Sequence, residues 1–455
     1  MGLTTTWAAA SERLGGSLRD LTVRNVVRPL VGGTGLRVRL TNAFGDRVVR
    51  FGHVYVGVPR AGAVLEPGSN RMVTFGGSPE VSLAPGATVL SDPLPGRVEA
   101  RQRLAVSVYV RGEAGTLTGR NRATAPAFPP LATPPPSAYP PPTADATSAQ
   151  ATSAQATLAR WEPALSPGYR SLPGDHAADE SGGAYTEEVA VWHWLDALTV
   201  VTAEPVPVVA ALGDSLTTGV GSETGHGWAD HLAHRLDLAV VNEGVSGGKV
   251  LAAGTGRPAE ERLTAEVLTK PGIETVILQA GLNDLGADAR AEDLIAAYRR
   301  IAATAHAAGV RIVCGTITPF GGAEYYTTER ESARQTVNAF VRENVSPEGR
   351  AEHDGRTSEG RAEHDSRTSD RRAEHDSRAS DRRAEHNGSA TGGPAGTGVF
   401  DGVADFDVAL RDPADPGRLL PRYDSGDHLH PSAAGHQAMA AAIDVRSLRR
   451  IPQPG

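Results

Sequence analysis

The stretch VPVVAALGDSLTTGVGS (residues 206–222) decides how the rest of the chain is interpreted. Its first seven residues are apolar, and the run then changes abruptly to Gly-Asp-Ser at 213–215, followed by two further glycines and an amphipathic segment. This order predicts a buried strand, a tight turn and a helix. Ser215 is therefore expected where a strand's carboxyl end meets a helix start, beside backbone N–H groups that can hold an oxyanion.

Downstream of Ser215, strand-like runs alternate regularly with helical segments. Strands are expected at 206–212, 238–242, 275–280, 310–317 and 402–406, and helices at 227–236, 292–308 and 328–343, with a last helix that opens at Pro431. This alternation predicts a mostly parallel sheet with helices on both faces. Ligands of such sheets bind beyond the carboxyl ends of the strands.

Three further polar patches accompany this pattern, namely NEGVSG (242–247), GLND (281–284) and DHLHP (427–431). The first two follow strand-like runs, so Gly247 and Asn283 are expected at the same sheet edge as Ser215. Each patch also has a purely structural explanation. Gly247 could be a turn residue, Asn283 a helix cap, and His430 a residue that merely precedes a helix.

Taken together, the motifs resemble those of the SGNH (GDSL) family of serine esterases and lipases. The four marker residues of that family match Ser215, Gly247, Asn283 and His430, in the same order along the chain. The resemblance implies an α/β domain of the flavodoxin-like, three-layer SGNH hydrolase type. More loosely, the N-terminal region resembles that of actinobacterial-type members, which carry a β-domain with similar LTNAFG, FGG and LSDPL segments.

The chemistry of ester hydrolysis by a serine assigns a role to each of these residues. Ser215 would attack the acyl carbon, and His430 would take its proton and return it to the leaving alcohol. Asp427 would orient the imidazole of His430. The oxyanion would be held by the backbone N–H groups of Ser215 and Gly247 and by the side-chain amide of Asn283.

Other polar residues near the motifs receive smaller roles. His428 is a rival base, although the family pattern Asp-x-x-His-Pro selects His430. Asp214 and Asp284 are expected to accept hydrogen bonds from loop amides, as short acidic side chains do at turns, and Asn242 to hold the second loop.

The region before Ser215 is β-like and predicts a smaller β-sandwich-like domain. Its expected strands are 22–28, 36–41, 48–58, 71–75 and 104–110, separated by turns at short intervals. Alternation returns at 185–202, which is interpreted as the closing strand. Trp192 and Trp194 in this segment could line a sugar-binding face, but packing is favoured.

Two segments interrupt the expected domains, which are 1–204 and 205–447. A Pro/Ala/Thr/Ser-rich insertion at about 126–156 lies within the first, and an insertion at about 346–396, built on an RAEH repeat of 11 residues, lies within the second. Both compositions predict disorder. The equally spaced histidines of the repeat could suggest a metal site, but the repeat lacks helix formers and the close spacing that metal sites need.

Composition narrows the remaining possibilities. The formal net charge is −8, whereas nucleic-acid-binding proteins usually carry a basic patch. Neither a membrane span nor a standard signal peptide is recognisable in the sequence. The chain as given is therefore expected in the cytoplasm, or outside the cell if the start codon is misassigned.

Cys314, the single cysteine, lies in an apolar run and is expected to be a buried thiol. Gly213, Gly219 and Gly221, which follow the strand expected at 206–212, match neither the dinucleotide-binding motif G-x-G-x-x-G nor a P-loop.

The sequence thus predicts a serine hydrolase that cleaves short-chain acyl or acetyl esters, on small molecules or on carbohydrate, without a metal or organic cofactor. Two alternatives stay open. One is a lipase or acylhydrolase for longer acyl lipids, and the other is a catalytically inactive carbohydrate-binding protein. The sequence leaves the oligomeric state open.

Overall fold

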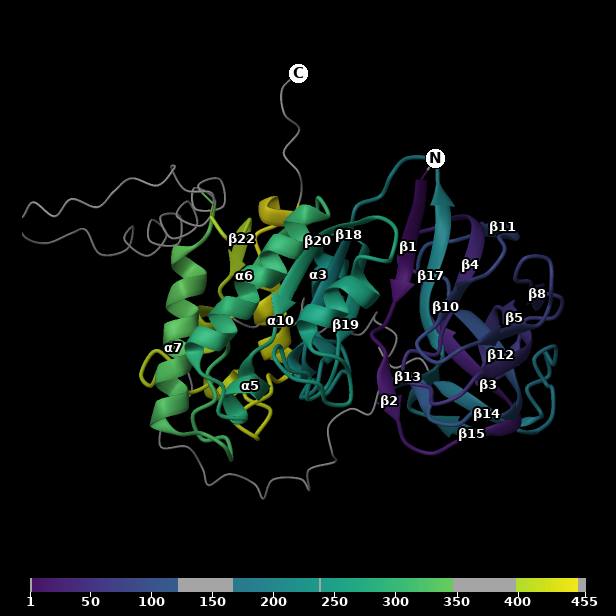
Figure 1. Ribbon diagram of the computed structural model, residues 1–455, viewed down its shortest axis with the longest axis horizontal. Helices are drawn as coiled ribbons and strands as arrows, with labels where there is room; N and C mark the ends of the chain where they lie inside the picture. The colour runs from purple at the N-terminus through teal and green to yellow at the C-terminus, as the bar shows by residue number, and fades with distance from the viewer. Residues whose placement is uncertain (1, 122–166, 237–238, 347–397, 449–455) are drawn as a thin grey trace, which may run out of the picture.

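The computed structural model describes residues 2–121, 167–236, 239–346 and 398–448 (Figure 1). The predicted Pro-rich insertion at 126–156 and the RAEH repeats lie outside the described residues. Strands up to residue 202 form antiparallel sheets, whereas the strands from residue 208 onward form one parallel sheet with helices.

The parallel sheet has the strand order β19-β18-β20-β21-β22. Its strands are β18 (Val208–Gly213), β19 (Ala239–Gly244), β20 (Ile273–Gln279), β21 (Arg311–Gly315) and β22 (Gly402–Ala404). Every neighbouring pair is parallel, and β18 lies between β19 and β20, with Gly213 opposite Gly244 on one side and Gln279 on the other. The carboxyl ends of β18, β19 and β20 therefore meet at one edge of the sheet.

Helices cover both faces of this sheet. Along β18, Val208, Ala210 and Leu212 belong to one buried cluster, whereas Val209 and Ala211 belong to another, as the period of two in a strand requires. The first cluster is completed by α4 (Ala259–Arg262), α5 (Leu282–Gly286), α6 (Ala291–Ala307) and α7 (Thr328–Glu343). The second is completed by α3 (Trp228–Leu236), α9 (Phe406–Leu410) and α10 (Ala433–Ala442).

The observed ends of the elements correct three expectations. The strand expected at 310–317 ends at Gly315, because the Ile317 amide donates to Asn338 Oδ1 of α7 (2.7 Å) instead of to a neighbouring strand. The strand expected at 402–406 ends at Ala404, because Asp405 caps α9. The last helix does not open at Pro431, since the Ser432 side chain accepts a hydrogen bond from the Gly435 amide and caps a helix that begins at Ala433.

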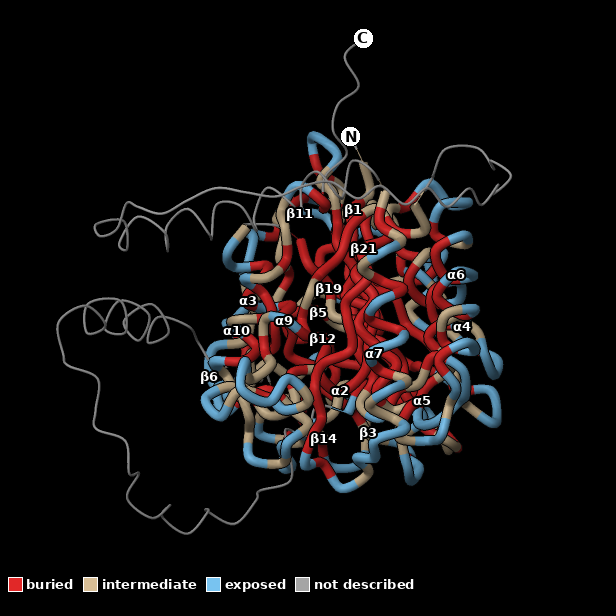
Figure 2. The backbone as a smooth tube through the Cα atoms, turned by 90° about the vertical axis from the view of Figure 1, so that its left-hand side faces the viewer, coloured by how far each residue is buried: buried red, intermediate tan, exposed pale blue. Residues whose placement is uncertain are grey.

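Two larger antiparallel sheets enclose the core of the N-terminal part. The first contains β1 (Gly2–Ala8), β17 (Leu195–Thr202), β4 (Gly33–Thr41), β10 (Thr88–Leu90) and β11 (Leu94–Val98). The second contains β15 (Tyr185–Val189), β14 (Gly168–Pro173), β3 (Arg19–Val27), β12 (Leu104–Glu113), β5 (Val49–Gly57), β8 (Arg71–Val73) and β9 (Val81–Leu83). Inward-facing residues of both, such as Val38 of β4 and Val108 of β12, share one buried cluster, as the buried interior in Figure 2 illustrates.

The closing strand expected at 185–202 is in fact three strands in three sheets. They are β15, β16 (Val191–His193) and β17, and β16 pairs with β13 (Leu117–Asn121), which also pairs with β2 (Glu12–Leu14). Trp194 separates β16 from β17 with a φ of 55°, a conformation that ends regular strand pairing. Its indole is fully buried, and Trp192 packs edge-on against Trp7 at 5.0 Å, so both tryptophans serve packing and form no exposed sugar-binding face.

The N-terminal sheets contact the parallel sheet through its β19 edge. Ala9, just after β1, forms a parallel bridge with Asn242 of β19, and the Thr5 amide donates to the Pro271 carbonyl at 3.0 Å. Ala8 and Ala197 belong to the same buried cluster as Leu212 of β18. The two parts are therefore joined by backbone hydrogen bonds and by a shared apolar core.

Within the described residues, no helix is both long and apolar enough to cross a membrane.

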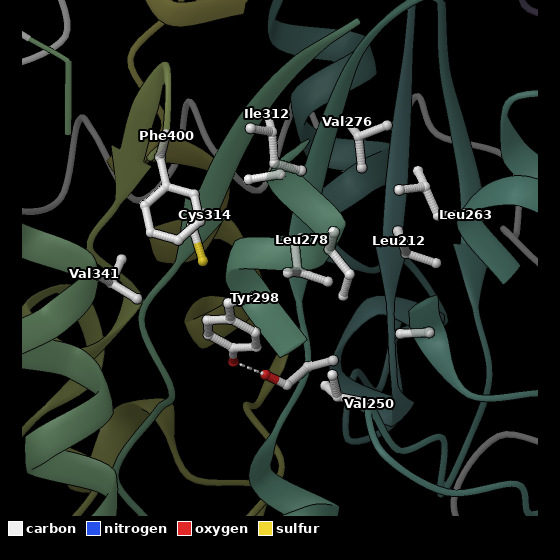
Figure 3. Packing of buried hydrophobic residues seen from close by; sticks show 14 of the residues in the cluster. Leu212, Val250, Leu263, Val276, Leu278, Tyr298, Ile312, Cys314, Val341 and Phe400 are labelled. Atoms are coloured by element: carbon white, nitrogen blue, oxygen red, sulfur yellow. Dashed lines mark hydrogen bonds between the residues drawn. The ribbon is translucent and has the colours of Figure 1, made fainter. Parts of the chain in front are cut away.

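The core beside the sheet contains Cys314 and Tyr298 (Figure 3). Cys314 is a free, buried thiol, as predicted, and burial raises its pKa. The hydroxyl of Tyr298 donates a hydrogen bond to the Ala280 carbonyl, and its ring is fully buried. Ala280 is the residue at which β20 turns into the segment that carries Asn283.

Replacing Tyr298 by Phe should lower the free energy of unfolding by about 1–3 kcal/mol, because it leaves the buried Ala280 carbonyl without its donor. Urea unfolding of the variant beside wild type measures this difference. Tyr326→Phe is the control, since Tyr326 is 38% exposed and its hydroxyl can be replaced at little cost. Equal stability of the two variants would show that the Tyr298 hydrogen bond contributes nothing.

Candidate active site

Ser215 lies where β18 gives way to the short helix α2 (Ser215–Thr218). The turn around it, residues 213–219, is called the Ser215 turn below. The Asp214 side chain caps α2 by accepting from the Leu216 amide at 3.0 Å, and Gly219 ends the helix with a φ of 95°. At Gly213, a Cβ atom would lie 2.0 Å from Thr217 Oγ1 and 2.4 Å from the Gln279 carbonyl, so only glycine fits. The serine is thus presented at the sheet edge by a turn that the sequence prescribes locally.

The structure joins Ser215 to His430 and Asp427 in a continuous chain of hydrogen bonds. His430 Nε2 lies 2.9 Å from Ser215 Oγ, and His430 Nδ1 lies 2.6 Å from Asp427 Oδ2. Both side chains are mostly buried, with 15% of His430 and 19% of Asp427 exposed. This is the order of groups in which a carboxylate orients an imidazole and the imidazole accepts a proton from a hydroxyl.

Asp427 is also held by groups on its own loop. Its Oδ1 accepts from the amides of Leu429 and His430 at 3.0 and 2.8 Å and from the Ser425 hydroxyl at 3.2 Å. Burial alone would raise the pKa of Asp427, but hydrogen bonds from the side chain and backbone of His430 hold it well below its usual range. The carboxylate therefore stays ionised at neutral pH and can stabilise an imidazolium.

His428, the rival base, lies in a different pair. Its Nδ1 is 2.6 Å from Asp424 Oδ2, its amide donates to Asp424 Oδ1 at 3.0 Å, and nearly half of its side chain is exposed. Its backbone φ is 61°, so the chain turns sharply here, and the imidazole that faces Ser215 is that of His430. Two His–Asp pairs thus occupy one loop, and only one of them contacts the serine.

Gly247 and Asn283 lie on the loops that follow β19 and β20. Residues 244–251 are called the Gly247 loop below. Gly247 has a φ of 71°, and a Cβ atom there would meet no atom within 4 Å. Glycine is therefore required by this left-handed backbone and not by close packing in the protein. The Asn283 side-chain amide donates to the Gly248 carbonyl at 3.1 Å, which ties the two loops together and leaves its second N–H for another acceptor.

Further side chains hold these loops in place. Asp284 accepts hydrogen bonds from the amides of Val250 and Leu251 at 2.8 and 2.9 Å. Asn242 accepts from the Gly244 amide at 3.0 Å and donates to the Thr217 carbonyl at 2.6 Å. The Gly247 loop is therefore joined to α5 at one end and to the Ser215 turn at the other.

Two buried arginines near the site escaped the sequence analysis. Arg262 donates to the Gly213 carbonyl at 3.1 Å and to the Glu243 carbonyl, and Arg120, from the N-terminal part, donates to the Gly244 carbonyl. Arg120 stands in an alternating β segment, LTGRN, where a charged residue normally faces water. Nothing in the local pattern distinguishes it from the exposed arginines nearby.

Among the described residues, no group of three or more His, Cys, Asp or Glu side chains could hold a metal ion. The equally spaced histidines of the RAEH repeat lie outside this part of the chain.

Part of the chain matches a known protein family. Residues 211–355 match the model of the GDSL-like Lipase/Acylhydrolase family. The chain therefore carries, over these residues, a domain of this family of carboxylic ester hydrolases, with the SGNH hydrolase fold. No curated protein matches the chain.

Several solved structures are similar to it at low identity. A family two carbohydrate esterase from Clostridium thermocellum, in complex with cellohexaose, is 13% identical with a TM-score of 0.35, over 97% of this chain and 96% of that one. A GDSL-like lipase from Bacteroides thetaiotaomicron is 15% identical with a TM-score of 0.32, over 53% and 89% of the two chains. A lipolytic G-D-S-L protein from Veillonella parvula is 13% identical with a TM-score of 0.30, over 52% and 96%.

One titratable group of the site has an unusual environment. Asp214 is fully buried and its Oδ2 has no hydrogen-bond partner among the described residues. Burial raises the pKa of Asp214 to about 7. In the unfolded chain this carboxyl ionises near its usual value of about 4. The folded state therefore binds more protons than the unfolded state between about pH 4 and pH 7, so this group makes the protein less stable as pH rises through that window.

Asp214→Asn should accordingly become more stable relative to wild type as pH rises, by about 1.4 kcal/mol per unit within this window. Chemical unfolding of both proteins at pH 5, 6 and 7 tests the trend. Asp405→Asn is the control, because Arg342 lowers the pKa of Asp405 despite its burial. Asp405 is therefore ionised in both the folded and the unfolded state above about pH 4, and its effect on the free energy of unfolding should not change between about pH 5 and pH 7. A difference for Asp214→Asn that does not change with pH would contradict the assignment.

Proposed function

We propose that this chain is a serine esterase in which Ser215 is the nucleophile, His430 the general base and acid, and Asp427 the group that orients His430. The observation that carries the proposal is the hydrogen-bonded sequence from Ser215 Oγ through His430 to Asp427. His430 takes the serine proton during attack and gives it to the leaving alcohol, and water then releases the acyl group by the same steps in reverse order.

We assign the oxyanion of the tetrahedral intermediate to three donors. They are the backbone N–H groups of Ser215 and Gly247 and the side-chain N–H of Asn283 that is not used by Gly248. Gly247 suits this role because its left-handed backbone has open space where a side chain would stand. Asn283 suits it because α5 and the Gly247 loop both fix its position.

The proposed substrates are short-chain acyl or acetyl esters, on small molecules or on carbohydrate. The loop that carries His430 supports this choice, because it has polar side chains such as Asp424, Ser425 and His428, which suit a polar alcohol group. Esters with long acyl chains are the alternative. A preference for chains of twelve or more carbons would favour that alternative.

We also propose the domain organisation that underlies this function. Residues 205–447 would form a flavodoxin-like, three-layer catalytic domain, and residues 1–204 a β-sandwich-like domain that precedes it. The parallel order of β18 to β22 and the shared core of the two N-terminal sheets support this division.

The first experiment measures hydrolysis of p-nitrophenyl acetate and butyrate by wild type and Ser215→Ala. We expect the variant to lose about 10³-fold or more of kcat/KM, because the nucleophile is removed. Fluorophosphonate labelling, mapped by peptide analysis, should modify Ser215 in wild type only. Ser222→Ala is the matched control, since Ser222 is also buried and its hydroxyl contacts Thr224. If wild type and Ser215→Ala hydrolyse the esters equally slowly and neither is labelled, the result would favour the alternative of a catalytically inactive carbohydrate-binding protein.

The two histidines of the 424–430 loop make a second test. His430→Ala should lower kcat/KM by about 10²- to 10⁴-fold, because the general base is lost. His428→Ala should stay within about fivefold of wild type, because its imidazole is paired with Asp424 and does not contact Ser215. Comparable losses in both variants would contradict the assignment of His430 as the base.

A further inference from the structure

Arg120 connects the N-terminal part of the chain to the loop that would hold the oxyanion. It lies in β13 and is 5% exposed. Its Nη1 donates to the Gly244 carbonyl, and its Nη2 lies 3.4 Å from Asn242 Oδ1. This contact is a direct route from the N-terminal part to the Gly247 loop.

Both of these acceptors belong to the frame of the candidate site. Gly244 packs against the Ser215 turn so closely that a Cβ atom would lie 2.7 Å from the Thr218 nitrogen. The next amide, that of Val245, donates to the Gly213 carbonyl at 3.0 Å. Asn242 donates to the Thr217 carbonyl. The guanidinium of Arg120 therefore holds the stretch of backbone that is hydrogen-bonded to the Ser215 turn and leads to Gly247.

Arg120 is part of a buried set of six charges, called here the interface charge cluster. It contains three acids and three bases, namely Glu12, Glu243, Glu266, Arg120, Arg262 and Lys270. Arg120 Nε lies 3.5 Å from Glu12 Oε1, and Lys270 Nζ lies 2.6 Å from Glu243 Oε1. Because the charges balance, the guanidinium can remain ionised in the interior and hold a carbonyl strongly.

The segment that follows the Gly247 loop is held from the N-terminal part as well. The Arg13 amide donates to the Thr255 carbonyl at 2.7 Å, and Arg257 donates to the Ala43 carbonyl at 3.3 Å. The Phe44 ring contacts both guanidinium groups, with its centroid 5.6 Å from that of Arg13 and 5.4 Å from that of Arg257. The segment from Gly244 to Arg257 is thus fixed at both ends by residues of the N-terminal part.

We propose that Arg120 is a positioning residue through which the N-terminal part sets the place of the Gly247 amide. The inference rests on the proposed function, since it concerns the donor assigned to the oxyanion. A peptide group is planar, so a Gly244 carbonyl held by Arg120 also fixes the direction of the Val245 amide, which lies two residues before Gly247 and donates to the Gly213 carbonyl. The same contact turns the Gly244 carbonyl toward the guanidinium. The N-terminal part is then a component of the catalytic apparatus.

The test compares Arg120→Met with Arg39→Met in the full chain. Arg39 is the matched control, because it is another buried guanidinium of the N-terminal part, but it lies 3.3 Å from Asp196 and stands on β4, which pairs with β10, β11 and β17. We expect Arg120→Met to lower kcat for p-nitrophenyl acetate by about 10- to 100-fold with KM nearly unchanged, since the loss falls on the transition state. Arg39→Met should keep kcat within about threefold of wild type. Equal kcat values in wild type and Arg120→Met would overturn the proposal, as would equal losses in the two variants.

Hydrogen exchange of peptides covering 242–251 gives a readout that does not depend on turnover. These amides should exchange faster in Arg120→Met than in wild type, and at the wild-type rate in Arg39→Met. Unchanged exchange in Arg120→Met would overturn the proposal. If wild type and Ser215→Ala hydrolyse esters equally while exchange still responds to Arg120, the proposed function fails and the structural link stands.

Arg120→Lys covers the case in which Arg120→Met does not fold. Lysine keeps the positive charge beside Glu12 but offers a single ammonium in place of the guanidinium fork. We expect a folded protein with a smaller loss of kcat, an unchanged KM and intermediate exchange of 242–251. Wild-type kcat and exchange in Arg120→Lys would show that the charge, and not the hold on Gly244, is what the protein needs.

Discussion

Backbone carbonyls at the ends of β18 and β19 need donors, and the protein supplies them from buried guanidinium groups. Arg262 serves the carbonyls of Gly213 and Glu243, and Arg120 serves that of Gly244. A strand that ends inside a protein leaves such groups without partners, and an unpaired buried carbonyl is costly. The guanidinium groups thus hold these carbonyls toward the interior at the points where the chain turns toward Ser215 and Gly247. The geometry of the site depends on this arrangement.

Much of the parallel domain follows from local pattern. The apolar run before Ser215 and the amphipathic helices can be found in the sequence, since each depends on neighbouring residues. The site residues stand at strand ends, and parallel strands end at one edge, so their proximity follows from topology. His430 could be preferred over His428 only by the family pattern, and the reason appears in the pairing of His428 with Asp424.

Other features depend on contacts between distant parts of the chain, which local pattern does not contain. The alternation at 185–202 is real, but Trp194 divides it among three sheets. Arg120 looks like a solvent-facing residue of a strand until β19 is placed beside it. The reason why a glycine stands at position 247, a left-handed backbone beside open space, appears only in the structure.

The pairing of β1 with β17 has a consequence for the order of events during synthesis. The hydroxyls of Thr4 and Thr202 lie 3.1 Å apart, although the residues are 198 positions apart in the chain. A ribosome therefore releases the first strand long before its neighbour exists, and that edge of the sheet waits for its partner. Contacts of such separation form slowly. The strand that completes the sheet is followed directly by β18, so the N-terminal sheet can close only after the chain has been made almost as far as the strand leading to Ser215.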